Sequence, residues 1–149
     1  MAQFASAAFT GTDGTELSVA DANWTKHGFG DGDDFLIITN RVRTASAGST
    51  RVSQYYHSGT PASADYSVTA DLYIVDANGG DNGGSVAARL DTAAYTFYFG
   101  RYNGAVGSWQ MYKWVAGSAT QLGSSVAESL SAATTHQVKL ECIGTAIKL

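Results

Sequence analysis

Apolar and polar residues alternate with a period of two along most of the chain, which is the pattern of strands buried on one side only. In residues 67–75 every second position is apolar. These positions are Val68, Ala70, Leu72 and Ile74. We predict strands over residues 35–43, 51–56, 67–75, 85–90, 94–102, 108–115 and 138–142. No segment shows a helical period, and only residues 129–133 are compatible with a short helical turn.

Turn-forming residues separate these segments at the spacing typical of an antiparallel sandwich. Gly, Asp, Asn and Ser gather at residues 13–14, 28–34, 47–49, 76–84, 103–104 and 116–118. The pair Asn103-Gly104 is the strongest hairpin signal, because both residues tolerate a positive φ. No linker and no internal repeat interrupts the pattern. We therefore predict a single all-β domain over residues 1–149, built as an antiparallel two-sheet sandwich.

The end of the sequence predicts a strand at 138–142, a tight turn at Gly144-Thr145 and the beginning of another strand at 146–149. An unpaired strand edge is a place where another chain can add. Two interpretations stay open: the domain lacks its last strands, or another chain completes the sheet.

The composition is that of an ordered domain. The 149 residues are 44% hydrophobic and 15% charged, with 17 glycines. A chain of this length buries about 70% of its unfolded surface, so it needs neither a disulfide nor a metal to hold a core. Cys142 is the only cysteine, which leaves no intrachain disulfide.

Charge and hydropathy limit the kinds of partner that this chain is expected to bind. The formal net charge is −4 and the Lys and Arg residues are scattered singly, whereas nucleic acid and anionic membranes attract clustered cations. No stretch of 18 apolar residues predicts membrane insertion. Residues 1–9 have neither the positive nor the apolar region of a secretory signal, so we expect synthesis in a cytosol.

Four groups of residues stand in an order that resembles a known family. The first is Phe9-Thr-Gly-Thr-Asp-Gly-Thr-Glu-Leu17 with Asn23-Trp24, and the second is Gly84-Ser-Val-Ala-Ala-Arg89 with Ala94-Tyr-Thr-Phe-Tyr-Phe99. The third is Trp109-Gln-Met-Tyr-Lys113 with Gly117 and Leu122, and the fourth is His136–Gly144. Together they cover nearly the whole chain and resemble concanavalin A-like, laminin-G-like jelly-roll domains. That family continues with a further half-hairpin and a closing Gly-rich strand, which this sequence lacks.

The resemblance implies a jelly-roll sandwich of the kind common in phage tail and virion proteins and in bacterial surface proteins. We expect a non-enzymatic phage virion component, such as a head-decoration, tail or fibre protein. It would assemble in the host cytoplasm, dock on other virion proteins and bind host cell-surface carbohydrate. A homo-oligomer about a symmetry axis would cover the open strand edge. The alternatives are a carbohydrate-binding module of a bacterial extracellular protein and, on weaker grounds, a glycoside hydrolase or lyase.

No catalytic residues are predicted. The glucanases that share the jelly-roll fold carry a Glu-x-Asp-x-x-Glu motif, whose paired carboxylates act as nucleophile and acid/base. Glu16, Glu128 and Glu141 are the only glutamates, and none belongs to such a motif. The three histidines lack the spacing of a zinc site. Cys142 lies on the apolar side of its predicted strand, which favours a buried, inert thiol.

Aromatic residues around the predicted hairpin are the candidate ligand contacts. Phe97 and Phe99 share one side of their strand with Tyr95 and Arg101, and we expect the core to take one side only. The other side would then carry Tyr98 and Tyr102, with either Trp109 or the pair Tyr112 and Trp114 from the next strand. Exposed Tyr and Trp stack on sugar rings or anchor a protein partner. The alternative is that loops cover these rings as a second layer of core.

Two arginines and one acidic loop complete the candidates. Arg89 and Arg101 either bond sugar hydroxyls and stack on a ring or pair with Asp71 or Asp91. A speculative calcium site consists of Asp76, Asn78, Asp81 and Asn82, because calcium binds such oxygen ligands. Asp and Asn beside Gly also simply form turns. No other cofactor is predicted.

Overall fold

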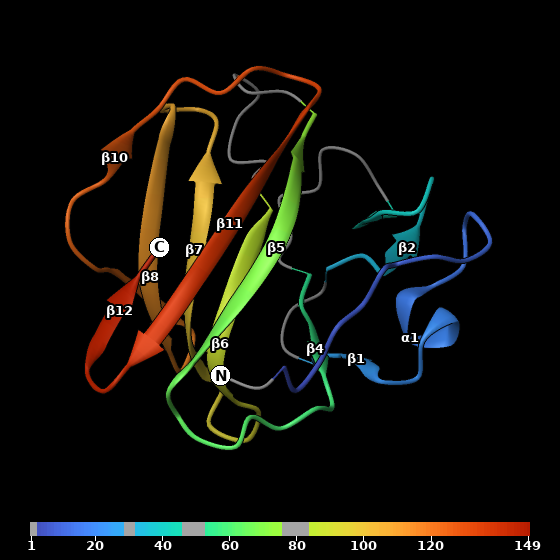
Figure 1. Cartoon of the computed structure of the whole chain (residues 1–149), viewed down its shortest axis with the longest axis horizontal. Helices are drawn as coiled ribbons and strands as arrows, with labels where there is room; N and C mark the ends of the chain where they lie inside the picture. Colours follow the sequence, from blue (N-terminus) through green and yellow to red (C-terminus); the bar gives the residue numbers. More distant parts are fainter. Residues whose placement is uncertain (1–2, 29–31, 46–52, 76–83) are drawn as a thin grey trace. The chain divides into compact units, whose positions relative to one another are not determined.

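Almost all regular structure in the chain is antiparallel β-sheet, as the period-two pattern predicts (Figure 1). The structure is a computed structural model that describes residues 3–28, 32–45, 53–75 and 84–149. The chain divides into two compact units, residues 1–62 and 63–149, and each is described by itself. The single domain over residues 1–149 therefore stays a prediction. No helix in the described ranges is long and apolar enough to cross a membrane.

In its described residues, the first unit contains one helical turn, α1 (Leu17–Ala20), and two small two-stranded sheets. One sheet pairs β1 (Trp24–Lys26) with β4 (Tyr55–His57), and the other pairs β2 (Phe35–Ile37) with β3 (Val42–Thr44). A small core of Leu17, Ile37 and Tyr55 joins the elements of this unit.

The structure corrects the single strand predicted over residues 35–43. Thr39 and Asn40 both adopt φ 54°, and Ile38 and Arg41 exchange backbone hydrogen bonds around them. Two successive positive φ angles form the tight turn that matches strand twist, so the segment folds into a hairpin. Of the strand predicted over residues 51–56, Tyr55 and Tyr56 belong to β4, which continues to His57, and residues 51–52 lie outside the described ranges.

The second unit contains two larger sheets. The first has the order β12-β11-β5. It is formed by β5 (Tyr66–Ile74), β11 (Thr134–Ile143) and β12 (Ala146–Lys148). The second has the order β10-β8-β7-β6, with β9 also paired to β8. It is formed by β6 (Ser85–Asp91), β7 (Thr96–Asn103), β8 (Ser108–Val115), β9 (Ser118–Gln121) and β10 (Val126–Ala127).

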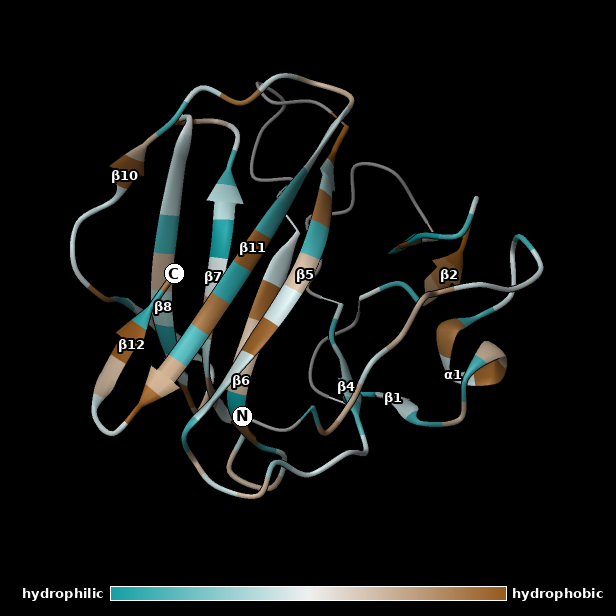
Figure 2. Cartoon of the chain, in the orientation of Figure 1, coloured by the Kyte–Doolittle hydropathy of each residue, from teal (hydrophilic) through white to brown (hydrophobic). Residues whose placement is uncertain are grey.

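These two sheets pack face to face through their apolar sides. The buried cluster joins Val86 and Ala88 of β6 to Val138, Leu140 and Cys142 of β11. Figure 2 shows the alternation of hydrophobic and hydrophilic residues along β5 and β11 that makes this packing possible. The predicted all-β, antiparallel sandwich is confirmed, and the jelly-roll strand order stays a prediction.

Three turns differ from the expectation in instructive ways. The hairpin predicted at Asn103-Gly104 is confirmed between β7 and β8, but Asn103 pairs with Ser108. Its loop is therefore four residues long, and Gly107 within it has φ 58°. The Asn103 side chain accepts the Ala105 N–H at 3.0 Å, which stabilises the wider turn. Residues 129–133 form no helix. In the part of the chain that the structure describes, the one helical turn lies at Leu17–Ala20, which is too short to show a helical period.

Candidate functional site

The register of β7 and β8 decides which side chains share a face of their sheet. On the face that turns toward β11, Trp109 and Met111 pack against the buried cluster of the sandwich. The opposite face, which we name the outer face, carries a set of cross-strand pairs. These pairs are Phe97 with Trp114, Phe99 with Tyr112, and Arg101 with Gln110.

Two candidate ligand contacts therefore lie on the inner side. Tyr102 is 2% exposed, its hydroxyl donates to the Glu128 carbonyl at 3.0 Å, and its ring meets Trp109 edge-on at 5.2 Å. The indole N–H of Trp109 donates to the Glu128 carboxylate. The prediction that Tyr102 lies on a binding surface is wrong, and β8 presents Tyr112 and Trp114 outward instead of Trp109. Tyr98 shares the inner face by alternation and is half-buried.

Gly100 leaves space for another side chain on this face of β7. It lies between Tyr98 and Tyr102 and has no side chain, so Leu149 packs directly over it. A Cβ atom at Gly100 would come within 2.1 Å of the Leu149 Cδ1 atom.

The outer face carries two parallel aromatic stacks. The rings of Phe97 and Trp114 are 5.9 Å apart with an interplanar angle of 19°, and those of Phe99 and Tyr112 are 5.1 Å apart at 14°. Each ring turns one of its flat sides to its neighbour across the strands. Phe97 is only 8% exposed. The groups of this face that could bind a ligand therefore lie around Tyr112.

Polar side chains surround the Tyr112 hydroxyl in a hydrogen-bonded group that we name the Tyr112 cluster. Its members are Arg101, Gln110, Tyr112, Gln121 and Ser125. The Oε1 atom of Gln110 accepts from the Tyr112 hydroxyl at 3.0 Å and from Arg101 Nη2 at 3.1 Å. The Arg101 guanidinium also lies over the Tyr112 ring, 5.1 Å from its centre. This arrangement holds a cation, a phenol and two amides in fixed positions beside a flat stack.

The sequence predicted two members of this cluster and missed the other three. Arg101 and Tyr112 were candidates, but Gln110, Gln121 and Ser125 were not. Gln110 could have been found from alternation, because residues 110, 112 and 114 share one side of β8. Gln121 is the last residue of β9 and Ser125 follows that strand, so only the pairing of β9 with β8 brings them to Tyr112.

Arg89 lies apart from the cluster, at an irregularity in β6 where its own φ is 54°. Its side chain donates to the Ala64 carbonyl at 2.9 Å and to the Asp65 carboxylate at 3.3 Å, and its backbone N–H donates to the Tyr66 hydroxyl. Asp65 also accepts the Gly144 N–H at 2.8 Å. The partner is Asp65 instead of Asp71 or Asp91, and the contacts favour a role in joining β5, β6 and the β11–β12 turn.

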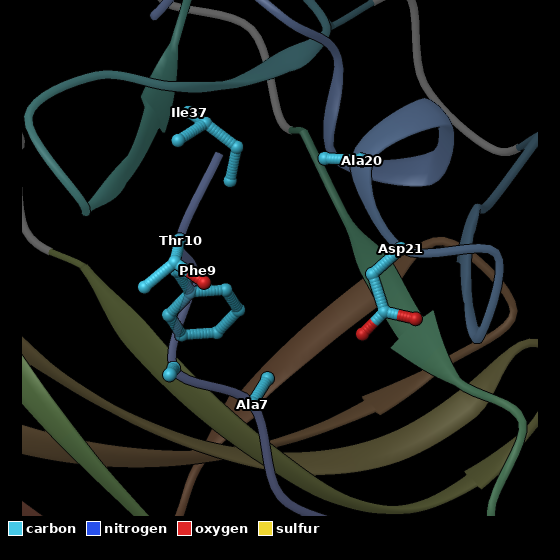
Figure 3. A pocket seen from close by; sticks show the side chains of 7 residues that line it. Ala7, Phe9, Thr10, Ala20, Asp21 and Ile37 are labelled. Carbon is cyan, nitrogen blue, oxygen red and sulfur yellow. The ribbon is translucent and has the colours of Figure 1, made fainter. Parts of the chain in front are cut away.

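The first unit holds a small hollow lined by Phe9, Thr10, Ala20, Asp21 and Ile37 (Figure 3). Its volume is about 220 Å³, below the range of about 300–1,000 Å³ usual for ligand pockets. One carboxylate, that of Asp21, lies at its edge, and its Oδ1 atom already accepts from the backbone and side chain of Asn23. The hollow therefore offers little chemistry to a ligand.

The same unit contains a partly buried contact between a phenol and a carboxylate. The Tyr55 hydroxyl donates to Glu16 Oε1 at 2.8 Å, and the Tyr55 ring stacks on Phe35 at 4.9 Å. Burial and the hydrogen bond to Glu16 raise the pKa of the Tyr55 hydroxyl well above its ordinary value of 10.0. The group stays protonated at physiological pH and serves to join α1 to the small sheets.

Within the described ranges, no group of three or more His, Cys, Asp and Glu residues could hold a metal ion. The predicted calcium ligands Asp76, Asn78, Asp81 and Asn82 lie outside these ranges. Cys142 is buried at the centre of the sandwich, as its strand pattern predicts. Burial raises the pKa of its thiol, which disfavours the nucleophilic thiolate.

Comparison with protein-family models, curated proteins and solved structures finds no match. The resemblance to jelly-roll domains therefore stays a prediction from the sequence.

Proposed function

We propose that this chain is a non-enzymatic binding protein whose Tyr112 cluster contacts carbohydrate. The observation that supports the proposal most directly is the hydrogen-bonded group of Arg101, Gln110, Tyr112 and Gln121 beside a flat aromatic stack. Sugars present hydroxyls that planar amides and guanidinium groups bond, and apolar C–H groups that pack on aromatic rings. Every residue of the neighbouring strand β9 is exposed, so a chain of sugars can approach along that edge.

The cellular setting that we propose is a phage virion, as a head-decoration, tail or fibre protein. This part of the proposal is supported by the order of the four residue groups that resemble phage jelly-roll domains. A carbohydrate contact fits an adhesive virion protein, because such a protein would meet the glycans of the host surface. The same cluster fits a carbohydrate-binding module of a bacterial extracellular protein, which is the second candidate.

A glycan array with matched variants tests the binding proposal. We expect the wild-type chain to bind a defined set of glycans, and Tyr112→Phe and Gln121→Ala to weaken binding about fivefold each, the effect of losing about 1 kcal/mol. Thr120→Ala is the control, because Thr120 is an exposed neighbour on β9 that points to the other face of the sheet. An array without signal, or equal binding by all four proteins, would contradict the proposal.

The setting is tested separately. We expect an antibody against this chain to label phage particles from cells that produce the protein, as seen by immunogold electron microscopy. Labelling confined to the cell surface or the culture medium would favour the bacterial module and would leave the glycan result unchanged.

A further inference from the structure

The turn that follows β4 is held by a side chain that can take up a proton. The Gly59 N–H donates to the Nδ1 atom of His57 at 2.8 Å. A neutral imidazole has one donor and one acceptor nitrogen, so this bond places the ring proton of His57 on Nε2 and leaves Nδ1 as the acceptor. A protonated imidazole carries a hydrogen on both nitrogens and can accept no hydrogen bond. The turn can therefore keep this bond in only one of the two charge states of His57.

Gly59 lies in a narrow space between His57 and residues 4–5. A Cβ atom at Gly59 would come within 2.9 Å of His57 Nδ1 and of the Phe4 carbonyl oxygen, and within 3.3 Å of the Ala5 Cβ atom. A larger residue would have to displace backbone, so the position favours glycine. Because Gly59 touches both segments, losing its bond to His57 would also loosen the contact of the turn with residues 4–5. Soon after this turn, at Ala62, the chain leaves the first unit.

Two neighbouring contacts do not depend on the charge of His57. The Ser58 N–H donates to the Asn23 carbonyl at 2.8 Å. The His57 ring meets the ring of Trp24, its cross-strand partner, at 5.2 Å with an interplanar angle of 87°. Neither contact uses Nδ1, so β1 and β4, which lie side by side in Figure 1, would stay paired when Gly59 is released. The effect of a proton is thus confined to the turn.

The ionisable groups on the elements around His57 are engaged elsewhere. They are Asp21, Lys26, Asp34, Glu16 and Tyr55. Each of them has a hydrogen-bond partner other than His57, and His27, which follows β1, faces the Tyr56 ring. Residues 3–9 contain no ionisable side chain. In the part of the chain that the structure describes, no carboxylate forms an ion pair with His57.

His136, in the second unit, has the opposite arrangement. The Thr134 hydroxyl donates its proton to the Ser131 carbonyl. The His136 Nε2 atom, 2.8 Å from the same hydroxyl oxygen, must therefore be a donor. An imidazole keeps this donor when it takes up a second proton, so the His136 contact survives in both charge states. His136 is for this reason a matched control for His57.

We propose that His57 is a proton-sensitive switch in the first unit. When the imidazole takes up a proton, the Gly59 turn loses its acceptor and separates from residues 4–5. Imidazole groups change charge at about pH 6.5 in ordinary surroundings, so mild acidification suffices. The bond is present on the neutral side of this change and is lost on the acidic side. The proposal is independent of carbohydrate binding, because His57 and the Tyr112 cluster belong to different units.

The test follows amide hydrogen exchange of the whole chain by NMR, in the wild type and in His57→Asn. The Oδ1 atom of asparagine is attached to Cγ, as Nδ1 of histidine is, and it accepts a hydrogen bond without titrating. At about pH 8 we expect equal protection of the Gly59 amide in both proteins. At about pH 5 the protection in the wild type should be about fivefold lower than in His57→Asn, the effect of losing one hydrogen bond. Comparing both proteins at one pH cancels the pH dependence of exchange itself.

The Ser58 amide is the internal reference, and its protection should not differ between the two proteins. His136→Asn should retain the wild-type response of Gly59. Equal protection of Gly59 in the wild type and His57→Asn under acidic conditions would overturn the proposal. A parallel loss of protection at Ser58 in the wild type would overturn it as well, because the whole unit would then be opening.

A second measurement needs no variant and decides the question if His57→Asn does not fold. The nitrogen NMR signals of the wild-type imidazole should show Nδ1 without a proton at about pH 8. During acidification the Gly59 amide signal should shift with the same midpoint as the His57 ring signals. A proton on Nδ1 at the higher pH, or a Gly59 signal that does not follow the ring, would show that the switch does not exist.

Discussion

Replacing Tyr102 by Phe removes one hydroxyl from the interior of the sandwich and leaves the aromatic ring in place. That hydroxyl donates to the Glu128 carbonyl at 3.0 Å and accepts the Leu130 N–H at 3.5 Å. The first distance is at the upper end of the usual range for an O–H···O hydrogen bond, and the second is longer than is usual for N–H···O, so the second bond is weak. Leu130 is buried, so water does not readily replace the lost acceptor. Leaving a buried group without its partner costs about 1–3 kcal/mol, and we expect about 1–2 kcal/mol here.

Urea unfolding measures this loss. With a slope of about 1–3 kcal/mol per molar urea, the midpoint of Tyr102→Phe should fall by about 1 M at an unchanged slope. The control is Tyr112→Phe, for which we expect a smaller loss of stability, because Gln110 Oε1 keeps Arg101 as a donor. The reasoning would be refuted if both variants lost equal stability, or if Tyr102→Phe weakened glycan binding without a change in the midpoint.

Three further predictions concern ionisable groups. The Cys142 thiol should react with iodoacetamide at pH 8 only after unfolding, because burial raises its pKa; rapid reaction of the native chain would contradict its placement. The raised pKa of Tyr55 means that the unfolded chain loses the phenolic proton first, so stability should fall as pH rises above 10.0. Glu16→Gln should make this alkaline loss shallower, and an unchanged pH profile would argue against the contact. The hydrogen bond from Lys139 lowers the pKa of Glu141 below 4.5. The small stabilising effect of the ionised Glu141 should therefore be present above that pH and disappear as the pH falls further. In acid unfolding titrations, Lys139→Met should abolish this pH dependence of stability.

The sequence by itself determined that this chain is built of antiparallel strands. Alternation is a local property: a strand with one dry side must place apolar residues at every second position, whatever it packs against. The predicted segments 67–75, 108–115 and 138–142 correspond to β5, β8 and the second half of β11 for this reason. The buried state of Cys142 followed from the same pattern. At Thr39 and Asn40 a tight turn interrupts the alternating segment. Alternation alone therefore predicted one strand where the chain forms two.

Only the tertiary structure decided which side of β7 became the interior. Both sides are aromatic, so hydropathy along the strand favoured Phe97 and Phe99 over Tyr98 and Tyr102. On the inner side Gly100 has no side chain, and Leu149, which lies far along the chain, packs over it. The Tyr112 cluster depends in the same way on Gln121 and Ser125, which reach Tyr112 only after the chain has turned back along β8. The alternation of residues along one strand shows that the strand has two different sides. The side chains that cover each side come from residues far away in the sequence, so only the folded structure decides which residues they are.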